Sequence, residues 1–310
     1  MCSSDLGGKA FPEWADHWAA RGYFALAMDL AGNGPQGRLP DGGPDQSDAV
    51  KFREFGAGEE REMWTYHAVS AVIRGHSLLR SVPGVDARRT GVTGISWGGY
   101  LTCIVAGLDP RFQAAVPVYG CGHLGENSYW VTNSLAAMTP ASRDRWLKLW
   151  DPSVYLPAVS RPILFLNGTT DFAYPLDSYQ KSYRHVPETL RHLSVVVDLP
   201  HGHIWTFPEV DAFMDGALDG GTGFPRLGVT EVKDRLVAAD LKSPLPVVEA
   251  LLCYTTDTGH WQARKWRTAA ARMDGGRVVA TLPEGARVVY LAIKDTRGLR
   301  ASSEHAEIRD

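Results

Sequence analysis

The segment RTGVTGISWGGYLT joins a short apolar run to a helix-like run through a very tight turn, and few folds can contain such a turn. The apolar run ends in Gly94-Ile95-Ser96-Trp97-Gly98. A serine at the centre of this turn takes a strained backbone conformation, and glycines two residues before and after it relieve the crowding. We therefore expect Ser96 to project from the end of a sheet as a nucleophile. The simpler interpretation, a glycine-rich helix start with Ser96 as its N-cap, stays open.

The chain around this turn alternates apolar strands with helical segments, which predicts a mostly parallel sheet covered on both faces. The predicted strands are Tyr23–Leu30, Thr90–Ile95, Ala114–Tyr119, Pro162–Asn167 and Leu193–Leu199. Apolar residues at helical intervals predict a long crossover helix over Glu60–Val82 and another helix over Phe207–Leu218. Residues 32–58 are rich in Gly, Pro and Asp and lack periodicity, which indicates a surface loop.

The pattern changes after residue 218. The segment GALDGGTGFPRLG interrupts it, and strand-like runs separated by turn signals follow. These runs are Val247–Tyr254, Ala263–Thr268, Arg277–Leu282 and Val288–Ile293. Short strands at this spacing predict a small all-β sandwich. The predicted organisation is an α/β catalytic domain over residues 1–220, a linker over 221–228 and a β-sandwich over 229–310.

A serine hydroxyl needs a histidine base, and the histidine needs a carboxylate that orients it. The segment PILFLNGTTDFAYP supplies the carboxylate, because Asp171 follows a predicted strand directly. A turn or helix cap is the alternative role for Asp171, and Asp177 is the weaker competitor as the acid. The segment VVVDLPHGHIW supplies the base.

Two histidines of that segment compete for the role. We favour His203, which lies 32 residues after Asp171, because Gly202-His203 resembles the Gly-His pair that closes the triad in many serine hydrolases. His201 is the alternative base. A metal site at this His-x-His pair lacks a third ligand nearby in sequence, so neither a metal nor a cofactor is expected.

With these motifs in place, residues 7–220 resemble the α/β-hydrolase superfamily, close to the acetyl xylan esterase, dienelactone hydrolase and prolyl-oligopeptidase group. The resemblance implies Ser96 as nucleophile, Asp171 as orienting acid and His203 as base, in the chain order typical of the superfamily. The segments NGTTDFAYPLDSYQKSY and DTRGLRASSEH also resemble bacterial secreted or periplasmic carbohydrate-ester hydrolases that carry a C-terminal sandwich.

The resemblance also implies an oxyanion hole and further strands upstream. One N–H donor would come from Trp97 and the other from the Gly7-Gly8 loop, most directly from Gly8. Such folds have three more strands before Tyr23. We therefore expect a truncated metagenomic reading frame whose first residues, MCSSDL at 1–6, are not native and whose native N-terminus lies upstream.

A 40-residue insertion, residues 121–160, lies between two predicted strands at the place where caps form over such active sites. Its aromatic residues include Trp130 and Trp150, which we expect to contact a sugar ring or an acyl group of the substrate. The alternative is that these rings pack the core of the cap itself.

Composition excludes several other classes of function. The formal net charge is −3 and no run of Lys or Arg is present, so nucleic acid is not an expected partner. No apolar stretch approaches the roughly 20 residues of a membrane span. The four cysteines have neither metal-ligand nor scaffold spacing, and a reactive thiol at Cys121 is a minor alternative. The sequence predicts no oligomeric state.

The expected function is a serine esterase, with a carbohydrate deacetylase of the acetyl xylan type as the finer prediction. A prolyl-oligopeptidase-like serine peptidase is the first alternative, although 107 residues follow His203 where such peptidases usually end soon after their catalytic histidine. The second alternative is a non-catalytic carbohydrate-binding protein. Its binding strip would be formed by Trp261, Arg264 and Trp266 in the sandwich.

Overall fold

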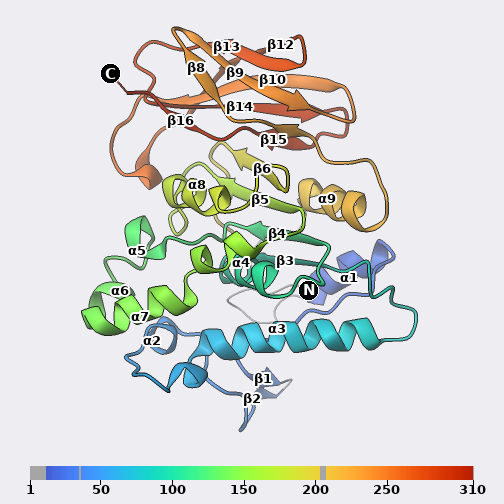
Figure 1. Cartoon of the computed structure of the whole chain (residues 1–310), viewed down its shortest axis with the longest axis vertical. Coiled ribbons are helices and arrows are strands. Elements are labelled where there is room, and N and C mark those ends of the chain that lie inside the picture. Colours follow the sequence, from blue (N-terminus) through green and yellow to red (C-terminus); the bar gives the residue numbers. More distant parts are fainter. Residues whose placement is uncertain (1–11, 35, 203–206, 310) are drawn as a thin grey trace.

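The computed structural model describes residues 12–34, 36–202 and 207–309. Residues 1–6, Gly8 and His203, for which the sequence predicts specific roles, lie outside the described residues. Figure 1 shows a parallel sheet with helices around it, and above this sheet a second group of layers built mostly of strands. The longest helix, α3, runs along the opposite end of the molecule from these strands.

The parallel sheet has the strand order β3-β4-β5-β6. Its strands are β3 (Gly91–Ile95), β4 (Ala114–Val118), β5 (Ile163–Gly168) and β6 (Arg191–Val196). The sequence predicts all four, with ends that differ by a few residues. Every residue of β4 and β5 is buried, as expected for central parallel strands that are covered on both faces.

Helices cover both faces of this sheet. The helices are α1 (Pro12–Ala20), α2 (Asp48–Lys51), α3 (Trp64–Ser81), α4 (Trp97–Leu108), α5 (Leu124–Asn127), α6 (Ser134–Ala137), α7 (Pro140–Trp150), α8 (Leu176–Arg184) and α9 (Pro208–Leu218). In β3, Gly91 faces Met214 of α9, whereas Gly94 faces Gly98 of α4. Positions an odd number apart point to opposite faces of a strand, so α4 and α9 cover opposite faces of the sheet.

The predicted crossover helix over Glu60–Val82 forms as the 3-10 helix η2 (Glu60–Glu62) followed by α3. The predicted surface loop at residues 32–58 also contains structure: the short strands β1 (Asn33–Gly34) and β2 (Gly37–Arg38) pair with each other, and α2 follows them. These elements are too short to produce a periodic signal in the sequence.

One predicted strand does not form. Residues 23–30 contain a single bridge residue, Ala27, instead of the expected strand over Tyr23–Leu30. Among the described strands β3 pairs with β4 alone, and a cavity of about 210 Å³ lies between β3 and residues 23–25. An apolar run becomes a regular strand only where a neighbour satisfies its backbone groups. The described part of the sheet offers no strand beside residues 23–30.

The C-terminal region contains two antiparallel sheets, as the sequence predicts. One has the order β11-β10-β14-β15 with β16 on β14, and the other has the order β12-β13-β9-β7 with β8 on β9. Their strands are β7 (Arg226–Leu227), β8 (Glu231–Lys233), β9 (Leu236–Lys242), β10 (Val247–Thr255), β11 (Arg267–Ala270), β12 (Arg272–Asp274), β13 (Arg277–Thr281), β14 (Val288–Asp295), β15 (Arg300–Ser302) and β16 (Ala306–Glu307). Because β7 pairs with β9, part of the expected linker at 221–228 joins a sheet. The predicted domain boundaries stay predictions.

The expected strand over Ala263–Thr268 is wrong at its start. Trp261–Ala263 forms the 3-10 helix η5, and β11 begins only at Arg267. The backbone N–H of Arg264 donates to the carbonyl of Trp261, and the N–H of Lys265 donates to the Asp257 carboxylate. These local bonds occupy groups that a strand ladder would use.

Candidate active site

Ser96 lies at the junction of β3 and α4, in the turn that the sequence predicts. Its backbone has φ 58° and ψ −118°, a conformation that is costly for any residue with a side chain. Two hydrogen bonds hold the turn: Ser96 N–H donates to Val118 O at 3.0 Å, and Tyr100 N–H donates to Ser96 O at 2.9 Å. The strain is therefore balanced by contacts of the sheet and the helix on either side.

The first glycine of the turn, Gly94, is required by close packing. A Cβ atom at Gly94 would lie 2.4 Å from the carbonyl carbon of Gly98, a distance that real Cβ atoms do not adopt. The strand and the helix therefore approach each other more closely than side chains would allow. This contact is the structural reason for a glycine at position 94 of the Gly-x-Ser-x-Gly turn.

His201 connects Ser96 to Asp171. Its Nε2 atom lies 3.0 Å from Ser96 Oγ, and its Nδ1 atom lies 2.7 Å from Asp171 Oδ2. The three side chains come from three separate loops, which follow β3, β5 and β6, at the carboxyl end of the parallel sheet. The structure brings Ser96 and Asp171 together as expected, through the histidine that the sequence analysis ranks second. His203, the preferred base, lies outside the described residues.

Asp171 is held by its own loop. Its Oδ1 atom accepts hydrogen bonds from the backbone N–H groups of Ala173 at 2.9 Å and Tyr174 at 2.7 Å. Its side chain is fully buried, and an ionised carboxylate there requires donors of this kind. With Asp171 ionised, His201 donates through Nδ1–H, which leaves Nε2 free to accept the proton of Ser96.

Asp177, the competing acid, has a different partner. It lies in the first turn of α8, and both of its carboxylate oxygens accept from the Asn127 side-chain amide, at 3.1 and 3.2 Å. This contact joins α8 to the segment that follows β4. The described geometry thus connects Asp171, and not Asp177, to a histidine.

Aromatic rings surround His201 on several sides. Tyr119 stacks on it with ring centroids 4.7 Å apart, and Phe172 meets it at an angle with centroids 4.9 Å apart. The hydroxyl of Tyr119 donates to Pro200 O at 3.1 Å, and burial raises the pKa of this phenol well above its ordinary value. Tyr119 therefore stays uncharged and packs against the His201 ring, which restricts the orientation of that ring. Its backbone also has a positive φ of 63°.

Of the two expected oxyanion donors, only Trp97 is described. It is the first residue of α4, where N–H groups have no intrahelical carbonyl to bind and the helix dipole favours negative charge. Gly8, the other predicted donor, lies outside the described residues. The oxyanion role of both residues stays a prediction.

The predicted substrate contacts Trp130 and Trp150 are buried. Trp130 is 5% exposed, packs 4.6 Å from the ring of Trp97 and donates from its indole N–H to Asp48. Trp150 is 8% exposed, and its carbonyl accepts from the Tyr100 hydroxyl. Neither indole presents an exposed face, so their contact with substrate stays a prediction, and the alternative of a cap core agrees better with their burial.

Other candidate chemistry is weak in the described residues. Residues 12–34, 36–202 and 207–309 hold no group of three or more His, Cys, Asp or Glu side chains placed to bind a metal ion. Burial raises the pKa of the Cys121 thiol well above its ordinary value, which opposes thiolate chemistry. None of the described helices is both long and apolar enough to cross a bilayer.

Comparison with known proteins places this geometry in context. Residues 7–129 match the family model of acetyl xylan esterase (AXE1). An uncharacterized peptidase, YuxL, of Bacillus subtilis is 30% identical over 116 residues, which cover 34% of this chain and 17% of the peptidase. The acetyl esterase Axe7A of Xylanibacter ruminicola is 27% identical over 122 residues, which cover 37% of this chain and 28% of the esterase.

A solved structure extends the likeness over more of the fold. Acetyl xylan esterase 1 from Thermoanaerobacterium superposes with a TM-score of 0.53 at 21% identity, over 69% of this chain and 72% of that one. The matched segments span less than a third of the length of either curated relative. The superposition shows a shared fold, whereas the matched segments alone do not establish the activity.

Proposed function

We propose that the chain is a serine hydrolase of the α/β-hydrolase superfamily that cleaves carboxylic esters through an acyl-enzyme on Ser96. The single observation that carries this proposal is the placement of His201 within hydrogen-bond distance of both Ser96 and Asp171. Acetylated carbohydrates of the acetyl xylan type are the proposed substrates, supported by the family model matched over residues 7–129.

The geometry supports a two-step reaction. His201 Nε2 removes the proton of Ser96 as Oγ attacks the ester carbonyl carbon, and the N–H of Trp97 stabilises the oxyanion that develops. The intermediate collapses, the bond to the leaving oxygen breaks, and His201 donates the proton to the departing alcohol. Water then attacks the acyl-enzyme with the same base. Asp171 holds the Nδ1–H tautomer and stabilises the imidazolium that forms.

The base in this proposal is His201. It replaces the preference for His203 because hydrogen-bond contact with both partners is stronger support than a spacing rule. In an active site of this kind the orienting carboxylate and the nucleophile must meet different nitrogens of one ring. His201 meets that requirement, with distances of 2.7 and 3.0 Å.

A peptidase is the second candidate function, and the match to the Bacillus subtilis peptidase is the observation that favours it. Peptide and ester cleavage use the same triad, so the triad alone does not separate them. The carbohydrate-binding alternative is less well supported. Trp261 and Trp266, which would form its binding strip, are 8% and 7% exposed and pack on His305 and Tyr290.

The proposal is tested with a fluorophosphonate probe and with paired acetyl esters and peptide p-nitroanilides. We expect the probe to label Ser96, and we expect p-nitrophenyl acetate to be cleaved far faster than any peptide substrate. Ser96→Ala should abolish both labelling and turnover. Labelling that persists in Ser96→Ala would exclude Ser96 as the nucleophile, and efficient cleavage of peptides alone would replace the esterase by the peptidase.

A further inference from the structure

Two half-exposed aromatic rings lie beside His201. Phe172 is 52% exposed and Tyr129 is 48% exposed, and their rings meet edge to face with centroids 5.6 Å apart. Phe172 also meets the His201 ring at 4.9 Å. The other rings around the site differ from this pair, since Tyr119 and Tyr174 are fully buried. Phe172 and Tyr129 thus form an exposed apolar surface at the catalytic histidine.

The loops that carry the two rings are joined to each other. Tyr129 N–H donates to Ala173 O at 3.4 Å, which links the segment after β4 to the loop after β5. Ala173 N–H in turn donates to Asp171, so the loop of Phe172 is fixed by the catalytic carboxylate. Backbone hydrogen bonds therefore connect the segments that carry the two rings to the triad.

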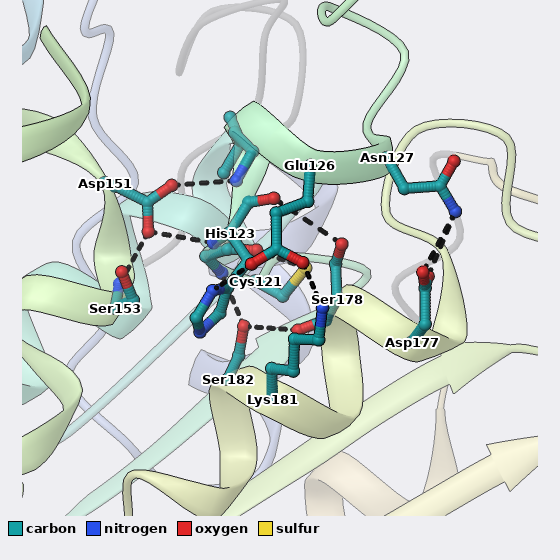
Figure 2. A network of polar contacts seen from close by, with 12 residues as sticks. Cys121, His123, Glu126, Asn127, Asp151, Ser153, Asp177, Ser178, Lys181 and Ser182 are labelled. Carbon is teal, nitrogen blue, oxygen red and sulfur yellow. Dashed lines mark hydrogen bonds and ion pairs between the residues drawn. The ribbon is translucent and has the colours of Figure 1, made fainter. Parts of the chain in front are cut away.

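The segment that leads to Tyr129 is anchored on its other side. Asp151 accepts from the backbone N–H groups of His123 and Leu124, both at 2.8 Å. Figure 2 shows the contact of Asp151 with His123 and that of Asn127 with Asp177. Ser182 Oγ accepts from Gly122 N–H at 2.9 Å at the start of the same segment. A surface held in place before the substrate arrives loses little ordering entropy on binding.

The chemistry of the triad decides which part of an ester meets this surface. His201 Nε2 must donate its proton to the oxygen of the departing alcohol. The alcohol therefore has to lie against His201. A substituent on that oxygen extends past the imidazole, and Phe172 lies beside that ring with Tyr129 in contact with Phe172. The acyl group remains on Ser96 Oγ after the alcohol has left.

We propose that Phe172 and Tyr129 form a leaving-group subsite, which binds the face of a ring-shaped alcohol such as a sugar or an aryl ring. This inference rests on the ester hydrolysis proposed above and assigns which side of the ester is recognised. Aromatic rings present flat apolar faces, and the C–H face of a pyranose or the face of an aryl ring fits such a surface. A small acyclic alcohol would leave it uncovered.

The subsite has a kinetic signature, because the two half-reactions differ in what they contain. In acylation the Oγ–C bond forms, the bond from carbon to the leaving oxygen breaks, and the proton passes from Ser96 through His201 to that oxygen. In deacylation the alcohol is gone, and water attacks the acyl-enzyme. A residue that contacts only the alcohol therefore affects acylation and leaves deacylation unchanged.

The experiment compares phenyl acetate with trifluoroethyl acetate, two activated acetates with and without a ring in the leaving group. Phe172→Ala and Tyr129→Ala should each lower kcat/KM for phenyl acetate about threefold to tenfold and leave trifluoroethyl acetate within about twofold. Deacylation of the acetyl-enzyme, followed in single-turnover experiments, should be unchanged. Tyr129→Phe should behave like the parent protein, because it keeps the ring.

The matched control is Phe24→Ala, since Phe24 is a similarly exposed ring, 55%, that lies beside Gly84, away from the triad. It should leave both acetates unaffected. Equal losses for the two acetates, or a changed deacylation rate, would show that Phe172 positions His201 and would overturn the subsite. Unchanged kinetics in both alanine variants would overturn it as well, while Ser96 labelling would still support the esterase. Absence of Ser96 labelling in the parent protein would overturn both proposals.

Discussion

Glu304 of the C-terminal region is buried against α8, and its Oε2 atom accepts a hydrogen bond from Arg184 Nε at 2.7 Å. Its other oxygen pairs with Arg191 at the start of β6. Beside this cluster, Val195 N–H of β6 donates to Ser302 Oγ of β15 at 2.9 Å. The antiparallel sheets are thus fastened to the last strand of the parallel sheet. Figure 1 shows β15 lying next to β6.

This attachment predicts a stability effect. Glu304→Gln removes the charge that pairs with two arginines in a site where the carboxylate is only 3% exposed. We expect the free energy of unfolding to fall by about 1.5–3 kcal/mol, the value of a hydrogen bond to a charged group. Urea denaturation measures the change. Glu284→Gln, at an exposed turn, is the control and should stay within about 0.5 kcal/mol of the parent protein. A Glu304 variant as stable as this control would contradict the prediction.

His305, next in sequence, predicts a pH dependence. Burial lowers the pKa of His305 to about 3, and the positive charges of Arg184 and Arg264 act in the same direction. Its Nε2 atom is buried and has no hydrogen-bond partner among the described residues. Because the unfolded chain protonates this histidine near pH 6.5, the unfolded state binds more protons between pH 6.5 and about 3. The contribution of His305 to stability is therefore complete above pH 6.5 and is lost as the pH falls toward 3.

The measurement is the urea midpoint as a function of pH. In His305→Phe, which keeps a ring against Trp261, the fall in stability between pH 6.5 and 4 should be shallower than in the parent protein. Titration of carboxylates affects both proteins, so the difference between the two curves isolates His305. Parallel curves would show that His305 is protonated as easily in the folded state as in the unfolded state.

The parts of the fold that could be predicted are those that depend on local sequence. The turn around Ser96 was predictable because strand, glycine spacing and helix are contiguous, and β3 to β6 were predictable because buried parallel strands form continuous apolar runs. The strand expected over Tyr23–Leu30 failed because its formation depends on a neighbouring strand, which an apolar run does not specify. The same limit applies to Ala263–Thr268, where a local turn competes for the backbone.

The candidate site, like the fold, could be predicted from the sequence only in part. Ser96 and Asp171 follow strands at short distances, so their sequence positions place them at the carboxyl end of the sheet. His201 and His203 both follow the last strand, and their separations from Asp171 differ by only two residues. The backbone conformation of this loop decides which histidine ring lies between Ser96 and Asp171. No local pattern in the sequence specifies that conformation. Phe172, next to Asp171, had a positional signal, since a residue beside a predicted catalytic acid lies at the site by necessity.

The close contact between Gly94 and Gly98 predicts that the turn does not tolerate a larger residue. In Gly94→Ala the new Cβ would lie 2.4 Å from backbone atoms of Gly98, so either the strand or α4 has to move. We expect a loss of about 1–3 kcal/mol in stability and at least a hundredfold loss in kcat/KM, since displacement of the nucleophile by about 1 Å is enough for such a loss. Gly259→Ala, where no atom lies within 4 Å of the new Cβ, is the control. Full activity in Gly94→Ala would show that the turn can widen without moving Ser96.

The choice of base leads to the last prediction, which compares His201→Ala with His203→Ala. His201 contacts both Ser96 and Asp171, so its removal takes away the proton acceptor and leaves the hydroxyl a poor nucleophile. We expect turnover of p-nitrophenyl acetate to fall at least a thousandfold in His201→Ala, whereas His203→Ala should keep at least a tenth of it. Fluorophosphonate labelling of Ser96 provides an independent measurement, because it needs the base but no productive substrate pose. If His203→Ala loses both turnover and labelling while His201→Ala keeps them, His203 is the base, and the spacing of 32 residues from Asp171 was the better guide.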